Sequence, residues 1–315
     1  KRLMGKMLNT LGIDTSNYTT SAAVYNNGKI AQRKMLLPVK KGELGLRQSD
    51  AVFHHVQQLP LVLEELLKEK IEYKAVGVSN RPRNIEGSYM PCFTVGMGTA
   101  KAISLSLGIP MYTFSHQAGH IAAALYSADK PELINSTFIA FHVSGGTTEA
   151  VLVTPDKDNV FNTEIIAQSL DLKGGQAVDR VGTMLNLPFP CGMELEKLAL
   201  KANTNFKIKP TLRGTDCCLS GVENKCRDML KKGYAKEEIA MYCLQSILAA
   251  LDGMTKELIK KYGNIPLLFA GGVMSNSIIR NELTSKYGAY FAKPQFSSDN
   301  AAGIAVLTAV KGGII

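Results

Sequence analysis

A short internal repeat constrains the fold of this 315-residue chain more than any other feature. Residues 12–25 align without a gap with residues 140–153, and the identical pairs include Ser16 with Ser144 and Thr20 with Thr148. Each copy consists of an apolar run, a turn of small and hydroxyl-bearing residues, and a second apolar run, which is typical of a β-hairpin. We therefore expect the chain to contain one structural unit twice.

The order of elements after each hairpin is also duplicated. A third strand over 29–37 follows the first hairpin, and a strand over 160–169 follows the second. Apolar residues at helical spacing then predict helices that alternate with short apolar strands. The predicted helices cover 50–70, 94–107, 239–262, 276–287 and 300–311, and the short strands cover 75–79 and 266–270.

A duplicated β-β-β-α-β-α unit predicts an α/β protein with two lobes around a central cleft, which is the actin-like (ASKHA) fold of actin, sugar kinases and Hsp70 proteins. We expect an N-terminal actin-like lobe over 1–134. The C-terminal actin-like lobe is expected over 135–315, with a helical insertion at about 176–235. The alternative is coincidence, because short β patterns resemble one another easily.

Composition narrows the class of protein. The chain is 45% hydrophobic, has no apolar run near the roughly 20 residues of a membrane span, and begins without a secretory signal, so we expect a cytoplasmic protein with no membrane contact. Its six cysteines form no C-x-x-C pair and are expected to be reduced thiols, mostly buried. The net charge of +9 and the basic residues between 207 and 232 suit an RNA partner or a plain solvated surface.

Two glycine-containing turns can bind a nucleotide. Val143 leads into Ser144-Gly145-Gly146-Thr147, where bare backbone and hydroxyl groups suit a phosphate, although such a turn is often only structural. Gly271-Gly272 follows an apolar strand and suits a base or ribose, or is simply a tight strand-to-helix turn. Asn276 can then cap the next helix or bind a ligand.

The chain also offers metal ligands. His116 and His120 are four residues apart at the start of a predicted helix, so both imidazoles lie on one face and can bind one divalent metal, zinc or iron. Such histidines can equally cap or pack. Asp299 precedes the last predicted helix and can be a third ligand or a helix cap. Asp179 can accept ribose hydroxyls or pair with Arg180.

Seven motifs in order resemble those of the TsaD/Gcp family, tRNA threonylcarbamoyladenosine synthases formerly described as O-sialoglycoprotein endopeptidases. The resemblance covers nearly the whole chain. The motifs are His116-x-x-x-His120, Val143 to Gly146, Asp171 to Arg180, Pro190-Cys191-Gly192, Leu219 to Glu223, Gly271 to Asn276 and Ser298 to Ala302.

The resemblance implies that His116, His120 and Asp299 bind one divalent metal, iron or zinc. It also implies that Asp179, Gly192 and Asn276 hold the adenylate of threonylcarbamoyl-AMP, from which the acyl group is moved to the exocyclic amine of a tRNA adenosine beside the anticodon. Partners implied are tRNA and either TsaB-like and TsaE-like proteins or a second copy of the chain. No catalytic residue is assigned.

The chain departs from the family pattern around the expected cleft. The opening segment has Asp14 and Asn17, and both later acids of the family's segment are gone, with Tyr18 and Thr19 in their places. The other departures are Thr147 for a histidine, Gln176 for a glutamate, and Arg81 with Arg83 in place of a Gly-Pro-Gly loop. They make the pocket more positive and remove carboxylates that could act as acids or bases. Rival interpretations are a non-catalytic nucleotide-binding paralogue and a transferase with another acceptor. A metallopeptidase is disfavoured because no H-E-x-x-H motif is present.

Overall fold

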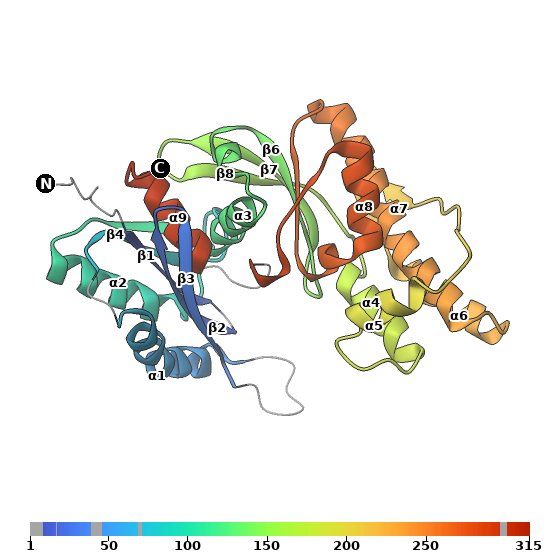
Figure 1. Ribbon diagram of the computed structural model, residues 1–315, viewed down its shortest axis with the longest axis horizontal. Helices are drawn as coiled ribbons and strands as arrows, with labels where there is room; N and C mark the ends of the chain where they lie inside the picture. Colours follow the sequence, from blue (N-terminus) through green and yellow to red (C-terminus); the bar gives the residue numbers. More distant parts are fainter. Residues whose placement is uncertain (1–8, 17, 39–45, 69–70, 297–300) are drawn as a thin grey trace, which may run out of the picture. The chain divides into compact units, whose positions relative to one another are not determined.

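A computed structural model describes residues 9–16, 18–38, 46–68, 71–296 and 301–315 (Figure 1). The chain divides into two compact units, one of Lys1–Ile134, Pro155–Asn162 and Ser298–Ile315, and the other of Asn135–Thr154 and Thr163–Ser297. Each unit contains a five-stranded sheet, with the strand order β3-β2-β1-β4-β5 in the first and β12-β11-β6-β7-β8 in the second. Read from the opposite edge, the second order repeats the first, which confirms the duplicated α/β unit.

The elements of the first half are β1 (Asn9–Ser16), β2 (Thr19–Asn26), β3 (Lys29–Leu36), α1 (Gln48–Leu66), β4 (Tyr73–Arg81), α2 (Phe93–Leu107), β5 (Met111–Ser115), α3 (His116–Ser127) and the 3-10 helix η1 (Pro131–Asn135). The second half consists of β6 (Phe138–Val143), β7 (Thr148–Asp156), β8 (Val160–Gln168), α4 (Gly174–Met184), α5 (Gly192–Ala199), β9 (Thr211–Arg213), β10 (Asp216–Cys218), α6 (Ser220–Lys231), α7 (Lys236–Tyr262), β11 (Leu267–Ala270), η2 (Gly272–Ser275), α8 (Ser277–Tyr287), β12 (Tyr290–Phe291), η3 (Pro294–Phe296) and α9 (Ala301–Lys311).

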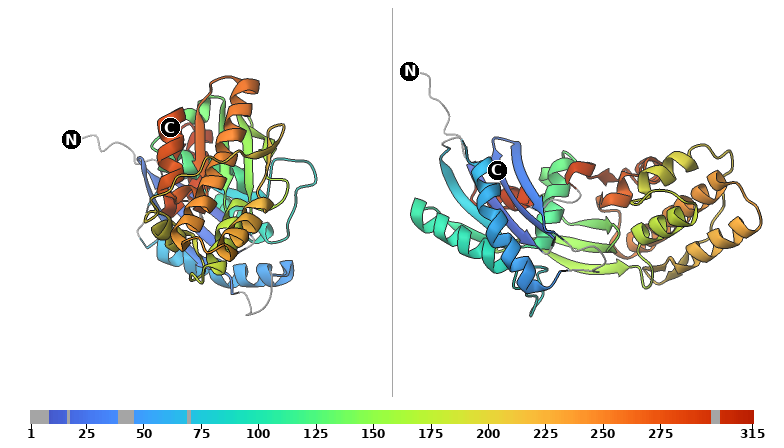
Figure 2. Two further views of the ribbon diagram at one scale, coloured as in Figure 1. Left: turned by 90° about the vertical axis from the view of Figure 1, so that its right-hand side faces the viewer. Right: turned by 90° about the horizontal axis from the view of Figure 1, so that it is seen from below.

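The side chains of β1 point alternately to the two faces of the first sheet. Leu11 and Ile13 are fully buried in a cluster with Leu59 of α1 and Ala100 of α2. Gly12, between them, faces the opposite side, where a Cβ atom would lie 2.9 Å from the Cα of Ala305 in α9. Successive residues of a strand point to opposite faces of the sheet, so β1 contacts helices on both sides. Helices α1 and α2 cover one face of this sheet and α9 covers the other, as Figures 1 and 2 show.

Small residues explain why α9 belongs to the first unit. A Cβ atom at Gly77 of β4 would overlap Thr308 of α9, and one at Gly303 of α9 would lie 2.7 Å from the amide nitrogen of Ala123 in α3. The helix therefore packs backbone-close against the sheet and α3. The expected division assigned residues 135–315 to one lobe; these contacts instead join α9 to the N-terminal part of the chain.

The second unit is built around the 27-residue helix α7, whose buried face includes Leu244, Ile247 and Leu251. Its sheet carries a stack of aromatic rings on three adjacent strands, with centroids 4.5 Å apart for Phe141 and Phe269 and 5.2 Å apart for Phe269 and Phe291. These contacts fix β6, β11 and β12 side by side. The carboxyl ends of β6 and β11, which are parallel, consequently open toward the same edge.

The predicted strands and helices recur in the structure with boundaries shifted by a few residues. The short parallel strands β5 and β12 were not predicted, because two to five residues carry too little periodicity to be recognised. Each of the six described cysteines is a free thiol, and five of them are buried. No helix in the described ranges is long and apolar enough to cross a bilayer.

Candidate functional site

The β6–β7 turn of the second unit is held by its own backbone. The Ser144 amide donates to the Thr147 carbonyl oxygen at 2.7 Å, and the Thr147 amide donates to the Ser144 hydroxyl at 3.2 Å. Gly145 and Gly146 between them are exposed, with no other heavy atom within 4 Å of where a Cβ would stand. The turn thus presents bare backbone, with room for a ligand that approaches its amides closely.

Two other glycines bring neighbouring segments against this turn. A Cβ at Gly175, in the first turn of α4, would lie 2.5 Å from the nitrogen of Gly145. One at Gly271, which has a φ of 103°, would lie 2.7 Å from the carbonyl carbon of Val143. The Gly175 amide donates to the Ser144 carbonyl oxygen at 3.0 Å. Only glycine permits this approach, so the start of α4 and the end of β11 meet at the hairpin turn.

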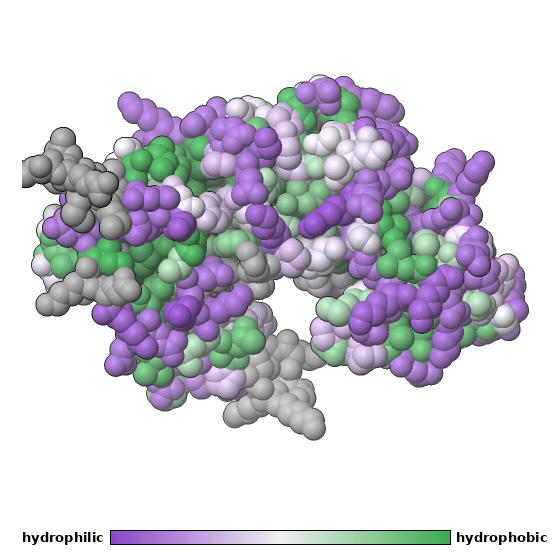
Figure 3. All heavy atoms as spheres, viewed as in Figure 1, coloured by the Kyte–Doolittle hydropathy of each residue, from purple (hydrophilic) through white to green (hydrophobic). Residues whose placement is uncertain are grey.

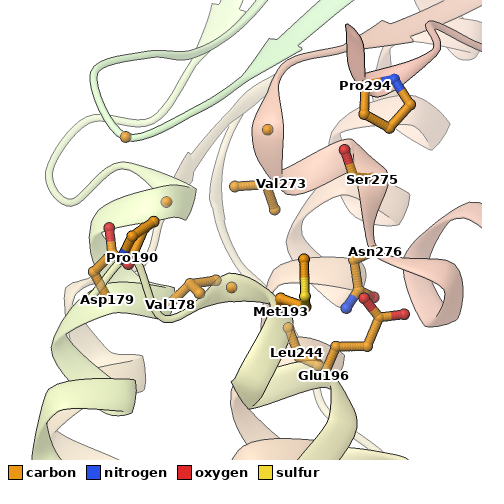
Figure 4. Close-up of a pocket in the computed structure, with 14 residues that line it drawn as sticks. Val178, Asp179, Pro190, Met193, Glu196, Leu244, Val273, Ser275, Asn276 and Pro294 are labelled. Atoms are coloured by element: carbon orange, nitrogen blue, oxygen red, sulfur yellow. The ribbon is translucent and has the colours of Figure 1, made fainter. Parts of the chain in front are cut away.

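These segments and α5 surround a cavity of about 540 Å³ within the second unit (Figure 4). Five of the residues expected to bind the nucleotide line it: Gly145, Asp179, Gly192, Gly272 and Asn276. The rest of the expected set lies in the adjoining turns, at Val143, Ser144, Gly146, Thr147 and Gly271. Apolar side chains supply much of the wall, from Val178, Pro190, Met193, Leu244, Val273 and Pro294.

Asp179 and Asn276 are both held in place by backbone amides. Asp179 Oδ1 accepts a hydrogen bond from the Cys191 amide at 2.9 Å, whereas Arg180 pairs with Glu223 at 3.0 Å. The structure therefore pairs Asp179 and Arg180 with other groups, and the expected alternative of an Asp179–Arg180 ion pair is wrong. Asn276 Oδ1 caps α8 by accepting from the Ile279 amide at 3.1 Å. Helix capping and exposure to the cavity are compatible in this residue.

Glu196 of α5 lines the cavity but was absent from the predicted site. Its Oε1 accepts a hydrogen bond from the Ser277 amide at 2.7 Å and another from the Ser277 hydroxyl, which ties α5 to the start of α8. Figure 4 shows the carboxylate beside Asn276. In the sequence Glu196 is one charged residue on an amphipathic helix, so its place in the wall follows only from the packing of α5.

The histidine pair lies in the first unit, at the start of α3. The rings of His116 and His120 have centroids 4.7 Å apart, and His116 Nδ1 lies 2.8 Å from Asp14 Oδ2. Asp14 lies near the carboxyl end of β1 and is fully buried. Burial would raise the pKa of this carboxyl, but the interaction with His116, together with the side chains of Ser16 and Ser79, outweighs burial and holds the pKa below its usual value.

This arrangement suits a metal. A carboxylate that accepts from Nδ1–H fixes the tautomer of His116 and leaves Nε2 as the nitrogen with a lone pair, the usual setting of a metal-bound imidazole. The third expected ligand, Asp299, lies outside the described residues. Among the residues that are described, no group of three or more His, Cys, Asp or Glu side chains is placed to hold a metal ion.

Three of the residues that differ from the family pattern form local hydrogen bonds in the structure. Gln176 Oε1 accepts from the Lys173 amide at 3.2 Å at the start of α4, and Thr147 closes the β6–β7 turn. Arg81 donates to the side-chain oxygens of Asn80 and Asn84. Asn17 lies outside the described residues.

Comparison with solved structures supports the fold. Component A of the (R)-2-hydroxyglutaryl-CoA dehydratase of Acidaminococcus fermentans superposes with a TM-score of 0.56 at 18% identity, covering 97% of this chain and 99% of that protein. A ROK family glucokinase of Streptomyces griseus gives a TM-score of 0.51 at 12% identity, covering 96% and 98%. The actin-like (ASKHA) fold is therefore confirmed.

Sequence comparison identifies the family. Proteins described as tRNA N6-adenosine threonylcarbamoyltransferase from Christiangramia forsetii and Thermus thermophilus are 28% and 29% identical to the chain. The alignments cover 95% and 94% of this chain and 92% and 90% of those relatives. The family model described as TsaD, tRNA N6-adenosine threonylcarbamoyltransferase, matches residues 40–306. Because this match spans most of the sequence, the chain belongs to the TsaD family.

Proposed function

We propose that the chain transfers a threonylcarbamoyl group from threonylcarbamoyl-adenylate to the exocyclic amine of the tRNA adenosine next to the anticodon. The observation that carries this proposal is the cavity of the second unit, where a bare glycine turn, apolar walls and carboxylates line one space. An adenylate has three matching parts: a phosphate, a flat base and a ribose with hydroxyl groups.

Each part has its own set of neighbours in the cavity. The exposed turn at Gly145 and Gly146 suits the phosphate, because backbone N–H groups bind anions without a side chain in the way. Val178 and Met193 face Val273 across the space in which a base would lie (Figure 4). The carboxylates of Asp179 and Glu196 suit ribose hydroxyls or the base amine, since both are hydrogen-bond donors.

The metal site is proposed on His116, His120 and Asp299, for one divalent iron or zinc ion. Such an ion would polarise the acyl carbonyl of the donor. Asp14 holds the His116 ring in the orientation that this role needs, through the 2.8 Å contact with Nδ1.

The chemistry is an acyl transfer with a single leaving group. The adenosine amine nitrogen forms a bond to the carbonyl carbon of the donor, the bond from this carbon to the adenylate oxygen breaks, and AMP leaves with that electron pair. The amine loses one proton, which passes to solvent water. The contribution of the glycine turn is to hold the phosphate while negative charge develops on it.

The test combines composition with activity. We expect about one metal ion per chain in the purified protein by elemental analysis, lost in both His116→Ala and His120→Ala, and we expect the wild type to modify a tRNA that carries the target adenosine. Failure of the metal-loaded wild type to modify any such tRNA, with AMP still bound, would favour the non-catalytic paralogue.

One feature of the sequence is the reason why the experiment also tests for a non-catalytic paralogue. Where the family has two further acids in the opening segment, this chain has Tyr18 just before β2 and Thr19 as the first residue of β2, so neither position carries a carboxylate. A transferase with another acceptor would release AMP from the adenylate only with that acceptor present. AMP release that begins when tRNA is added would therefore exclude both rivals, and release that begins only with another amine acceptor would favour the second.

tRNA itself is proposed to contact the second unit. Exposed basic residues occur in the segment before β9, on β9 itself, and on α6 and directly after it, at Lys207, Lys209, Arg213, Lys225, Lys231 and Lys232. Figure 3 shows that hydrophilic side chains cover much of the visible face at the α6 end of this unit. TsaB-like and TsaE-like proteins, or a second copy of the chain, are the further partners we propose.

A further inference from the structure

The loop after β4 runs beside the start of α3, the helix that carries the histidine pair. Arg81, the last residue of β4, is the register partner of Ser115, which directly precedes His116. The carbonyl oxygen of Pro82 accepts a hydrogen bond from the Gln117 amide at 3.0 Å, so the chain continues beside the first turn of α3. Arg81 therefore leaves the sheet at the carboxyl edge of the parallel strands β1, β4 and β5, where open α/β sheets bind ligands.

Neutral groups hold the Arg81 guanidinium in position. Nε and Nη2 donate to Asn84 Oδ1 at 3.1 and 2.6 Å, and Nη1 donates to Asn80 Oδ1 at 2.7 Å. Glu86 is the one acid in the sequence of this loop, and it is exposed and forms no ion pair with Arg81 among the described residues. Three of the five N–H donors are thus used for orientation, which leaves two for a ligand.

Such an arrangement is costly unless an anion completes it. Arg81 is half-buried, and burial lowers the pKa of its guanidinium. A partly desolvated cation without a counter-ion loses hydration that two amide oxygens replace only in part. A ligand with a planar pair of oxygens would recover this loss, because the guanidinium edge matches a carboxylate in two parallel hydrogen bonds.

We propose that Arg81 binds the carboxylate of the amino-acid part of the acyl donor and so selects donors that carry one. This inference rests on the proposed function, since the threonylcarbamoyl group has a free carboxylate whereas a simple carbamoyl group has none. Asn80 and Asn84 are positioning residues that aim the guanidinium.

The test measures binding to the purified full-length chain by calorimetry, with N-carbamoylthreonine and its carboxamide as probes. The wild type should bind the acid about tenfold or more tightly than the amide, as expected for a hydrogen-bonded charge pair. Arg81→Ala should remove this preference, and Arg81→Lys should restore part of it.

A second variant distinguishes a loss of binding from a loss of the folded structure. Asn84→Asp keeps both hydrogen bonds to Arg81 but supplies an internal counter-ion, so the preference for the acid should fall while the melting temperature stays near that of the wild type. Asn27→Asp adds the same charge at an exposed turn of the same unit and should leave the preference unchanged.

The outcomes separate this inference from the proposed function. Equal binding of acid and amide by the wild type, or an unchanged preference in Arg81→Ala, would overturn the role of Arg81 even if tRNA is modified. Conversely, an Arg81-dependent preference for the acid would stand if the wild type modified no tRNA, and the failure would then lie in the transfer reaction.

Discussion

Carboxylates lie toward both ends of the cavity in the second unit. Asp179 sits beside Pro190 and Glu196 beside Asn276, with apolar side chains between them (Figure 4). Both acids are oriented through one oxygen by a backbone amide, from Cys191 and from Ser277. An acid held in this way favours a neutral hydrogen-bond donor over a phosphate, because two anions would repel each other. The space between the two carboxylates is therefore better suited to the nucleoside part of the ligand, and the glycine turn at Gly145 is the part of the lining suited to the phosphate.

Replacing Glu196 should weaken nucleotide binding specifically. In Glu196→Gln we expect the dissociation constant for AMP to rise about tenfold, because a charged acceptor becomes neutral while the shape of the wall is kept. Glu194→Gln is the matched control, since Glu194 lies on the same helix and pairs with Lys197 away from the cavity lining. Calorimetric titration with AMP gives both constants. Equal weakening in the two variants would exclude a specific role for Glu196.

His55 predicts a pH-dependent stability. His55 is fully buried, with Nδ1 2.8 Å from the Thr20 hydroxyl, and burial lowers its pKa from 6.5 to about 4. The unfolded chain therefore binds a proton first as the pH falls. The contribution of the buried neutral imidazole to the free energy of unfolding should be fully present above pH 6.5. It should be lost as the pH falls from 6.5 to about 4, which lowers the free energy of unfolding by up to about 3 kcal/mol.

Denaturant unfolding between pH 4 and pH 7 measures this effect. In His55→Asn the decrease over that range should be smaller by the stated amount. His54→Asn, one residue away and only partly buried, should keep the decrease of the wild type. If His55→Asn and the wild type lost stability in parallel, the burial of a neutral imidazole would not be its cause.

The junction of the β6–β7 turn, α4 and β11 depends on backbone contact. A methyl group at Gly175 would come within 2.7 Å of three backbone atoms of Ser144 and Gly145, which cannot move aside as a side chain does. We expect Gly175→Ala to lower the free energy of unfolding by about 1–3 kcal/mol. Gly221→Ala in α6, where the added methyl group meets nothing within 4 Å, should be neutral or slightly stabilising. Urea unfolding of both variants checks this, and a neutral Gly175→Ala would contradict the close contact.

Periodicity allowed much of this architecture to be predicted, but not the contacts between distant segments. The hairpins and α7 are long enough for their patterns to be recognised, whereas β12 has two residues. Asp14 could be recognised only as a departure from a motif; its bond to His116 joins positions 102 residues apart. Glu196 belongs to no motif. Sequence patterns describe local structure well, and such side-chain pairs arise from tertiary packing.

The first unit as a whole depends on α9, which covers one face of its sheet. A chain that ends at residue 296 should leave that face of β1 and β4 exposed, since Gly12 and Gly77 offer no side chains to fill the space. By hydrogen exchange we expect β1 and β4 to lose protection, while α7 and β6 of the second unit keep theirs. A chain that ends at Lys311 is the control and should resemble the wild type. Full protection of β1 in the shorter chain would show that α9 is dispensable.

The place of α9 also affects the order of events during synthesis. The second unit lies in the sequence between the first and last segments of the first unit, so a growing chain contains all of the second unit before the last helix of the first has been made. Until then the small-residue face of the first sheet stays uncovered on the ribosome. The unit with the histidine pair should therefore be the last to complete its fold, and it is the one that would need a chaperone during translation.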